Sequence, residues 1–178
     1  VTHGAFDPTV LPVVRLVASR AANGTVRLTP AELDEAAALT GMGRLRLHGG
    51  TVVLTRAGMG VTLDGIAKGR VVDLAVEAAR AAGATSLLVN AGGDVRALGS
   101  PERGGAWRIA VQDPTGRGKA ATVVELSDGA LATSGNYEAY YDRERLFHHI
   151  VTPATGRSPG LAAGVSVSAH TCAEADAL

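Results

Sequence analysis

Three observations predict an α+β fold, a mainly antiparallel sheet with a few packed helices, in a single domain over residues 1–178. Short turns separate consecutive strand-like segments, and such turns join antiparallel strands. Helical patterns are few and lie apart, which argues against a doubly wound fold. Hydrophobic residues make up 46% of the chain, enough for a core of its own, and no linker interrupts it.

The first third of the chain predicts two helices and a hairpin. Residues 11–18 form an apolar stretch that starts helical. Thr29-Pro30-Ala31-Glu32 has the pattern of a capping box with proline at the first helical position, so we expect a helix from there to Gly41. Residues 44–48 and 51–56 alternate like strands, and Gly49-Gly50 between them is a two-residue hairpin turn.

The centre of the chain is a helix that follows a glycine-lined loop. From Arg70 to Ala82 apolar residues recur with helical spacing, and Gly83 stands where glycine commonly ends a helix. Gly65 and Gly69 would let the backbone come close to a ligand, and Lys68 adds a positive charge beside them. Free N–H groups at a helix N-terminus bind anions, so phosphate is the first ligand to consider.

A second glycine-lined loop follows this helix. Residues 87–89 are typical of a buried strand, and residues 90–94 form a polar turn with Asp94 at its tip. The chain returns as a strand over residues 95–98. Further strands are expected at residues 107–112, 122–126, 131–133 and 163–169.

The end of the chain predicts a last helix. Thr171 and Glu174 have the spacing of a second capping box, and Asp176 lies in the first turns of the helix that would follow. Cys172, the single cysteine, is expected to be a small core residue. Because the chain begins in mid-pattern at Val1 and stops inside this helix, we expect a fragment truncated at both ends, and any leader or lipid anchor would lie outside it.

Composition excludes several classes of protein. Seventeen basic and seventeen acidic residues cancel, and no basic run is interleaved with aromatics, so nucleic acid is not an expected partner. A single cysteine forms no internal disulfide. No apolar run approaches the ~20 residues of a membrane span, so no direct span is expected in this part of the chain.

The segment 136–147 holds most of the few aromatic residues. Tyr137, Tyr140, Tyr141 and Phe147 would either stack on a planar ring system or cover an edge of the core. The sequence leaves both interpretations open.

Five short segments, in this order, resemble the motifs of the ApbE family of FAD:protein FMN transferases. The resemblance covers nearly the whole chain, and residues 5–10 also resemble the family's Phe-Asp-x-Thr-Val segment. It implies a T-fold-like α+β domain. The segments are Gly65-Ile66-Ala67-Lys68-Gly69, Val89-Asn90-Ala91-Gly92-Gly93-Asp94, Ala132-Thr133-Ser134-Gly135, His148-His149-Ile150 with Pro153, Thr155 and Gly156, and Ala175-Asp176-Ala177-Leu178.

The resemblance implies a magnesium-dependent enzyme that moves FMN from FAD onto a Thr or Ser hydroxyl of an acceptor protein and releases AMP. It also implies an extracytoplasmic, membrane-associated protein. The residues expected to contact FAD are Asp7, Gly65, Ile66, Lys68, Asn90, Ala91, Gly92, Gly93, Asp94, Thr133, Ser134 and Gly135.

The metal and the general base are also implied by the resemblance. Magnesium prefers oxygen ligands, and the family's ligands correspond here to Asp176, the main-chain oxygen of Ala67 and a threonine position after residue 178. His149 matches the family's histidine, and histidine is the residue type best suited to take the proton from an attacking hydroxyl. Alternation places His148 on the opposite face of the strand from His149.

Two segments depart from the family's usual sequence. Residues 62–65 are Thr-Leu-Asp-Gly where Asp-Leu-Gly-Gly is common, and residues 152–156 are Thr-Pro-Ala-Thr-Gly where Asp-Pro-Arg-Thr-Gly is common. The second segment therefore lacks a carboxylate and an arginine. Two alternative functions stay open: hydrolysis of FAD to FMN and AMP, and a module that binds FAD without chemistry.

Overall fold

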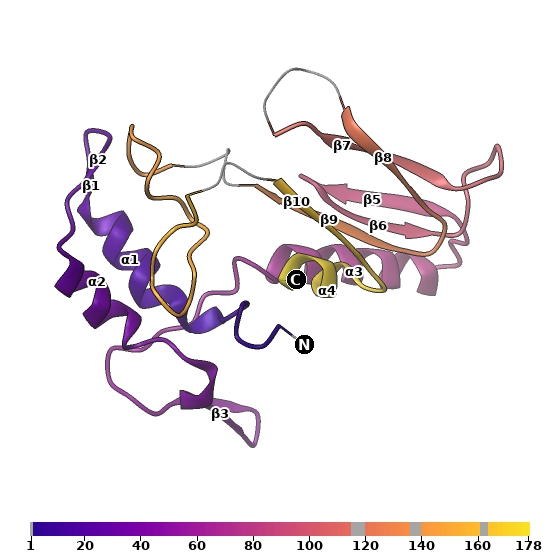
Figure 1. Ribbon diagram of the computed structural model, residues 1–178. Helices are drawn as coiled ribbons and strands as arrows, with labels where there is room; N and C mark the ends of the chain where they lie inside the picture. Colours follow the sequence, from indigo (N-terminus) through magenta and orange to yellow (C-terminus); the bar gives the residue numbers. More distant parts are fainter. Residues whose placement is uncertain (1, 115–119, 136–139, 161–163) are drawn as a thin grey trace. The chain divides into compact units, whose positions relative to one another are not determined.

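A computed structural model describes residues 2–114, 120–135, 140–160 and 164–178 (Figure 1). The chain groups into two compact units, Val1–Leu63 with Asn136–Leu161 and Asp64–Gly135 with Ala162–Leu178. The strands pair antiparallel and the helices are few, so the predicted α+β class is confirmed. That residues 1–178 form one domain truncated at both ends stays a prediction.

The first unit is built on two short helices that pack together. Their buried residues Val13, Val17, Leu33 and Ala36 form its core, against which Tyr141 and Phe147 pack. These two aromatics therefore cover a core edge, whereas Tyr137 lies outside the described residues. The elements are η1 (Pro8–Val10), α1 (Leu11–Arg20), β1 (Ala21–Ala22), β2 (Thr25–Val26) and α2 (Pro30–Ala37).

The capping box at the start of α2 is confirmed, but the helix ends earlier than predicted. Thr29 accepts a hydrogen bond from the Glu32 amide, and the Glu32 carboxylate accepts one from the Thr29 amide. The last helical residue is Ala37 rather than a residue near Gly41. After it, the amides of Leu39 and Thr40 donate to carbonyls three residues back, and the Thr40 hydroxyl also donates to the Ala37 carbonyl at 2.8 Å. These tighter bonds end the α-helix.

The hairpin predicted after α2 is present. It follows η2 (Met42–Arg44) and consists of β3 (Leu45–His48) and β4 (Thr51–Leu54). Gly49 and Gly50 have φ values of 53° and 78°, the positive values that a two-residue type I′ turn requires. Glycine adopts them without steric cost.

The second unit has a four-stranded antiparallel sheet with strand order β10-β9-β6-β5. Helices α3 (Ala67–Ala81) and α4 (Cys172–Ala177) contact each other and one face of this sheet (Figure 1). The strands are β5 (Leu87–Ala91), β6 (Asp94–Leu98), β9 (Gly129–Gly135) and β10 (Gly164–Ala169), and a separate hairpin is formed by β7 (Trp107–Gln112) and β8 (Ala120–Leu126).

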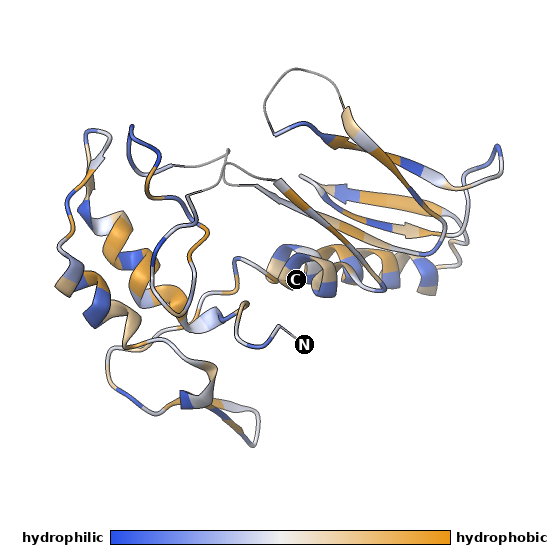
Figure 2. Cartoon of the chain, viewed as in Figure 1, coloured by the Kyte–Doolittle hydropathy of each residue, from blue (hydrophilic) through white to orange (hydrophobic). Residues whose placement is uncertain are grey.

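Apolar residues lie on both faces of the sheet (Figure 2). Alternate residues of β9 point to opposite faces, whereas β6 adds apolar core residues to one face only. Ala130 and Ala132 pack with Val72, Cys172 and Ala175 under the helices. The opposite face packs against the hairpin. That second cluster consists of Val95, Ala97, Leu126 and Leu131, with Trp107, Ile109, Val111 and Val124 around it.

Helix α3 begins three residues before the predicted start and ends at Ala81, one residue before the predicted Ala82, which is its C-cap. Its first residue is Ala67, so Lys68 and Gly69 belong to the first turn rather than to a loop. At the other end Gly83 has φ 96° and donates to the Arg80 carbonyl, and Ala84 donates to the Ala79 carbonyl. This is the Schellman pattern expected of a terminal glycine. None of the helices described has the length and apolar character of a membrane span.

Candidate active site

Three segments of the second unit meet at the N-terminus of α3. The Lys68 ammonium donates to the Gly92 carbonyl at 3.3 Å and lies 3.4 Å from Oδ1 of Asp94. Asp176, on α4, accepts a hydrogen bond of 3.0 Å from the Gly69 amide on α3. The helix start, the turn between β5 and β6, and α4 therefore bring two carboxylates and one ammonium together.

Asp94 is not at the tip of the turn, which corrects the prediction. Ala91 pairs directly with Asp94, so the turn consists of Gly92 and Gly93 alone, with φ values of 60° and 96°. Two glycines at positive φ are sufficient for a two-residue turn. As a result Asp94 is the first residue of β6.

Asp94 is a buried carboxylate with one unpartnered oxygen. Only 1% of the residue is exposed, and Oδ2 has no hydrogen-bond partner. Burial raises the pKa of Asp94, the charge of Asp176 raises it further, and Lys68 lowers it. A buried oxygen without a partner is costly, so its position here needs an explanation.

The pair formed by Asp94 and Asp176 fits a hard divalent cation. Magnesium is bound in proteins by one or two carboxylates, with further oxygens from water, carbonyls and substrate phosphate. The unpartnered Oδ2 of Asp94 is available as one such oxygen. No group of three or more His, Cys, Asp or Glu side chains suited to a metal occurs within the described part of the chain. Two carboxylates could hold such a cation only together with further oxygens from water, carbonyls or substrate, and magnesium binding at this site stays a prediction.

The N-terminus of α3 differs from the bare anion cradle that the sequence predicts. Its Gly69 amide is already bonded to a carboxylate, Asp176. Gly69 also has a packing role, because an added Cβ would lie 2.4 Å from the Cys172 carbonyl oxygen. The close backbone approach at Gly69 is thus made by α4 and not by a ligand.

Two other predicted FAD contacts of this unit, Asn90 and Thr133, lie close to the same turn. The Asn90 side chain accepts a hydrogen bond from the Gly93 amide at 3.1 Å and holds the turn. A Cβ on Gly93 would lie 3.7 Å from the Thr133 carbonyl, and the Thr133 hydroxyl is 2.8 Å from that of Ser166. Ser134 is exposed near the end of β9, which finishes at Gly135.

Residues 65–67 introduce α3. Gly65 and Ile66 lie in the turn before the helix, and Ile66 is its N-cap without a side-chain hydrogen bond. Ala67 is the first helical residue, and a carbonyl at that position points along the helix toward the fourth amide on. The role of the Ala67 oxygen in binding metal stays a prediction.

The two histidines, both in the first unit, lie in different environments. His148 is 1% exposed; its Nε2 is 3.0 Å from the Pro159 carbonyl, and its ring packs edge-on against Tyr140. His149 is exposed. The segment is a bend with an isolated bridge between Tyr140 and His148 rather than a regular strand. His148 is therefore structural, whereas the His149 ring is open to solvent.

Asp7, also in the first unit, has a capping role. Its Oδ1 accepts from the Thr9 amide at 2.8 Å and from the Thr9 hydroxyl at 2.5 Å. Its Oδ2 accepts from the Met42 amide at 3.1 Å. Both oxygens are thus occupied by this unit's own groups, and the predicted contact of Asp7 with FAD stays a prediction.

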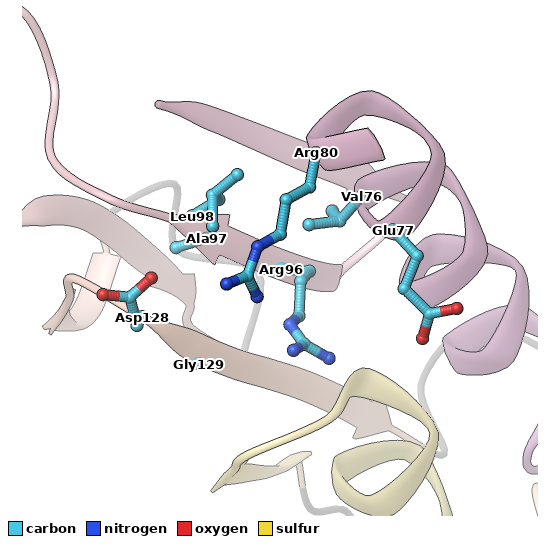
Figure 3. A pocket seen from close by; sticks show the side chains of 8 residues that line it. All are labelled: Val76, Glu77, Arg80, Arg96, Ala97, Leu98, Asp128 and Gly129. Atoms are coloured by element: carbon cyan, nitrogen blue, oxygen red, sulfur yellow. The ribbon is translucent and has the colours of Figure 1, made fainter. Parts of the chain in front are cut away.

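A pocket of about 350 Å³ lies elsewhere in the second unit (Figure 3). Its walls come from the later turns of α3 and from β6 and β9, and it contains none of the predicted site residues. Arginine and acidic side chains both line it. The residues are Val76, Glu77, Arg80, Arg96, Ala97, Leu98, Asp128 and Gly129.

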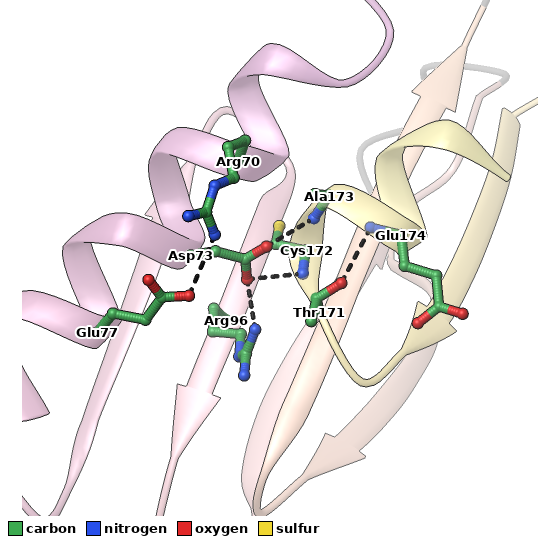
Figure 4. A network of polar contacts seen from close by, with 8 residues as sticks. All are labelled: Arg70, Asp73, Glu77, Arg96, Thr171, Cys172, Ala173 and Glu174. Carbon is green, nitrogen blue, oxygen red and sulfur yellow. Dashed lines mark hydrogen bonds and ion pairs between the residues drawn. The ribbon is translucent and has the colours of Figure 1, made fainter. Parts of the chain in front are cut away.

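Sequence reasoning missed two charged residues beside the site, Asp73 and Arg96. Asp73 is 1% exposed and forms an ion pair with Arg96, and its carboxylate also accepts hydrogen bonds from the first amides of α4 (Figure 4). The sequence pattern did contain a sign of Asp73's role. Asp73 lies on the same helix face as Val72 and Val76, and an acidic residue is unusual on such an apolar face.

Cys172 is a core residue, as predicted. It is fully buried, and burial, with the charges of Asp94, Asp73 and Asp176, raises the pKa of its thiol to about 12. Such a thiol is not a nucleophile at neutral pH.

Comparison with known proteins places this chain in a family. The sequence profile of the ApbE family matches residues 1–178. A relative from Vibrio cholerae named FAD:protein FMN transferase is 34% identical over 181 residues, covering 99% of this chain and 54% of the relative. One of the same name from Treponema pallidum is 38% identical over 139 residues, covering 72% and 38%.

Solved structures agree. The ApbE protein from Thermotoga maritima matches with a TM-score of 0.87 and 34% identity, covering 99% of this chain and 58% of that one. The flavin transferase ApbE from Vibrio cholerae matches with a TM-score of 0.83 and 33% identity, covering 99% and 57%. The chain spans about half the length of the curated relatives it matches.

The fold and site define an α+β protein in which two carboxylates and a lysine meet at a helix N-terminus beside a glycine turn. The chain belongs to the ApbE family.

Proposed function

We propose that this chain is part of a magnesium-dependent enzyme that transfers FMN from FAD to a Thr or Ser hydroxyl of an acceptor protein and releases AMP. Family membership and the names of the relatives support the flavin chemistry. The observation that carries the proposal is the buried, unpartnered oxygen of Asp94 beside Asp176 and Lys68.

The charges of the site favour a bound cation. A flavin dinucleotide carries two negative phosphates, which Asp94 and Asp176 would repel on their own. In the proposal these two carboxylates hold Mg²⁺, which when bound would offset the charge of the diphosphate and of the leaving AMP. Lys68 adds a fixed positive charge at the same place.

The proposed reaction forms one bond and breaks one. The acceptor hydroxyl oxygen attacks the phosphorus on the FMN side, and the bond from that phosphorus to the oxygen shared with AMP breaks. AMP leaves with that oxygen. His149 is the proposed base that takes the hydroxyl proton, a role supported by the family resemblance and by the exposure of its ring.

A direct experiment is to incubate a full-length protein containing this chain with FAD, Mg²⁺ and a candidate acceptor protein. We expect the acceptor to gain the mass of one FMN, with one AMP released per modification. Mass spectrometry of the acceptor and chromatography of the nucleotides measure both products. FAD should also bind more tightly than riboflavin, because the diphosphate contributes; equal affinities would contradict the role given to the phosphates.

The same experiment separates the proposed transferase from the two alternatives, an FAD hydrolase and a module that only binds FAD. The carboxylate and the arginine that are missing after His149 favour these alternatives. Release of FMN and AMP at equal rates with and without acceptor would identify an FAD hydrolase. Tight FAD binding by a magnesium-loaded protein with neither product would identify a binding module.

A further inference from the structure

Asp73 joins helices α3 and α4 from a buried position. Its Oδ1 accepts a hydrogen bond from the Cys172 amide at 2.8 Å, and its Oδ2 accepts one from the Ala173 amide at 2.9 Å. Arg96 from β6 forms an ion pair with Oδ1 (Figure 4). One carboxylate thus caps a helix that lies far along the chain from it.

Helix α4 depends on this cap. The first amides of a helix have no partner within the helix, so at a helix start inside a protein they need acceptors from elsewhere. The first two amides of α4 are satisfied by Asp73, and the third, that of Glu174, by the Thr171 hydroxyl at 3.2 Å. Without Asp73 two buried or half-buried N–H groups at the start of α4 would have no partner.

The same two helices also meet at the candidate site. Gly69 lies one turn before Asp73 on α3, and its amide donates to Asp176 on α4. The backbone of α4 approaches Gly69 so closely that a Cβ there would lie 2.7 Å from the Cys172 carbonyl carbon. Asp73 and Gly69 therefore attach successive turns of α4 to successive turns of α3.

We infer that Asp73 is a positioning residue for the magnesium site: by capping α4 it holds Asp176 beside Asp94. The inference rests on the metal site of the proposed function. Asp73 does not face the metal, since both its oxygens are used by α4 and Arg96. Removing a group that orients a metal ligand typically weakens metal binding by roughly 10- to 100-fold.

The test compares Asp73→Asn with Leu126→Ala in the full-length protein. The asparagine side chain would keep one acceptor oxygen but place an NH₂ group against an α4 amide, so the cap is half lost. Leu126 lies in the cluster on the opposite face of the sheet, so Leu126→Ala lowers the melting temperature without touching α4. Calorimetry gives the Mg²⁺ dissociation constant, and amide hydrogen exchange of residues 164–178 reports the order of α4.

We expect Asp73→Asn to weaken Mg²⁺ binding at least about tenfold and to speed exchange in α4, whereas Leu126→Ala changes neither. If Asp73→Asn is insoluble, Arg96→Met replaces it, since this variant removes the partner of Asp73 and should shift both readouts in the same direction.

Two results would overturn the inference: faster exchange with unchanged Mg²⁺ affinity, or equal loss of affinity in Leu126→Ala. Wild-type protein that binds no Mg²⁺ would overturn the inference together with the metal site. Wild-type protein that binds Mg²⁺ but transfers no FMN would overturn the proposed function alone, and the comparison of dissociation constants would still decide the role of Asp73.

Discussion

The backbone amide of Gly69 donates a hydrogen bond of 3.0 Å to Oδ2 of Asp176, which joins the first turn of α3 to α4. The anion at this helix N-terminus is therefore the protein's own carboxylate. It lies close enough to Asp94 for its charge to raise the pKa of Asp94. The two acids are thus held together by the fold, although like charges repel.

Gly69→Ala should destabilise the protein. An added Cβ would lie 2.4 Å from the Cys172 carbonyl oxygen and 2.8 Å from the Ala173 amide nitrogen, both backbone atoms. Overpacking of this kind typically costs about 1–3 kcal/mol, measured as the free energy of unfolding in urea. Gly43→Ala is the control, because a Cβ there meets nothing within 4 Å and should cost less than about 0.5 kcal/mol.

Asp176→Asn should weaken magnesium dependence and leave the fold intact. The amide oxygen of asparagine still accepts the bond from Gly69, while the charge that a hard cation needs is lost. The Mg²⁺ concentration for half-maximal FAD turnover should rise, while the melting temperature without metal stays within about 2 °C. Asp34→Asn on the exposed face of α2 is the charge-matched control, and a Mg²⁺ titration identical to the wild type would remove Asp176 from the site.

Asp94→Asn should stabilise the metal-free protein at neutral pH and impair its activity. The folded state raises the pKa of Asp94 above its ordinary value of 3.8, so folding disfavours the ionised form. Stability from this group is greatest below that value and falls as pH rises through the folded pKa. Asparagine has no carboxyl group to ionise, so the variant does not lose this stability as the pH rises.

Thermal melts from pH 3 to pH 8 without metal check this prediction. The melting temperature of Asp94→Asn should exceed that of the wild type near pH 7, and the difference should shrink toward pH 3. Added Mg²⁺ should stabilise the wild type and have little effect on the variant. A variant less stable than the wild type at pH 7 would show that the ion pair with Lys68 outweighs the cost of burying Asp94.

His149→Ala should lose FMN transfer while FAD binding and the fold persist. Removal of a general base typically costs on the order of a hundredfold or more, and an exposed side chain contributes little to stability. Single-turnover transfer to the acceptor measures the first effect, and flavin fluorescence the binding. FMN transfer at the wild-type rate would show that His149 is not the general base but an ordinary surface residue.

The structure decides which histidine is a suitable control for this variant. His148 is buried against Tyr140 and the Pro159 carbonyl, so His148→Ala should destabilise the protein by about 1–3 kcal/mol. His170 is exposed, and His170→Ala is the better control for a lost surface histidine.

The sequence alone determined the features that depend on neighbouring residues. The capping box at Thr29, the terminal glycine at Gly83 and the Gly49-Gly50 hairpin each follow from local geometry, and the structure has all three. The family motifs are also short local patterns, and they identified Lys68 and Asp94 as site residues. In the structure the Lys68 ammonium lies 3.4 Å from Oδ1 of Asp94.

Only the tertiary structure decided what long-range contacts control. Sequence spacing treats Gly69 as part of a ligand loop, whereas α4 fills the space beside it. It places Asp94 at a turn tip, whereas pairing with Ala91 makes it the buried first residue of β6. It gives no role to Asp73, because the amides it caps are about a hundred residues away in the chain. Burial and pairing across the fold set these roles, and no local pattern contains that information.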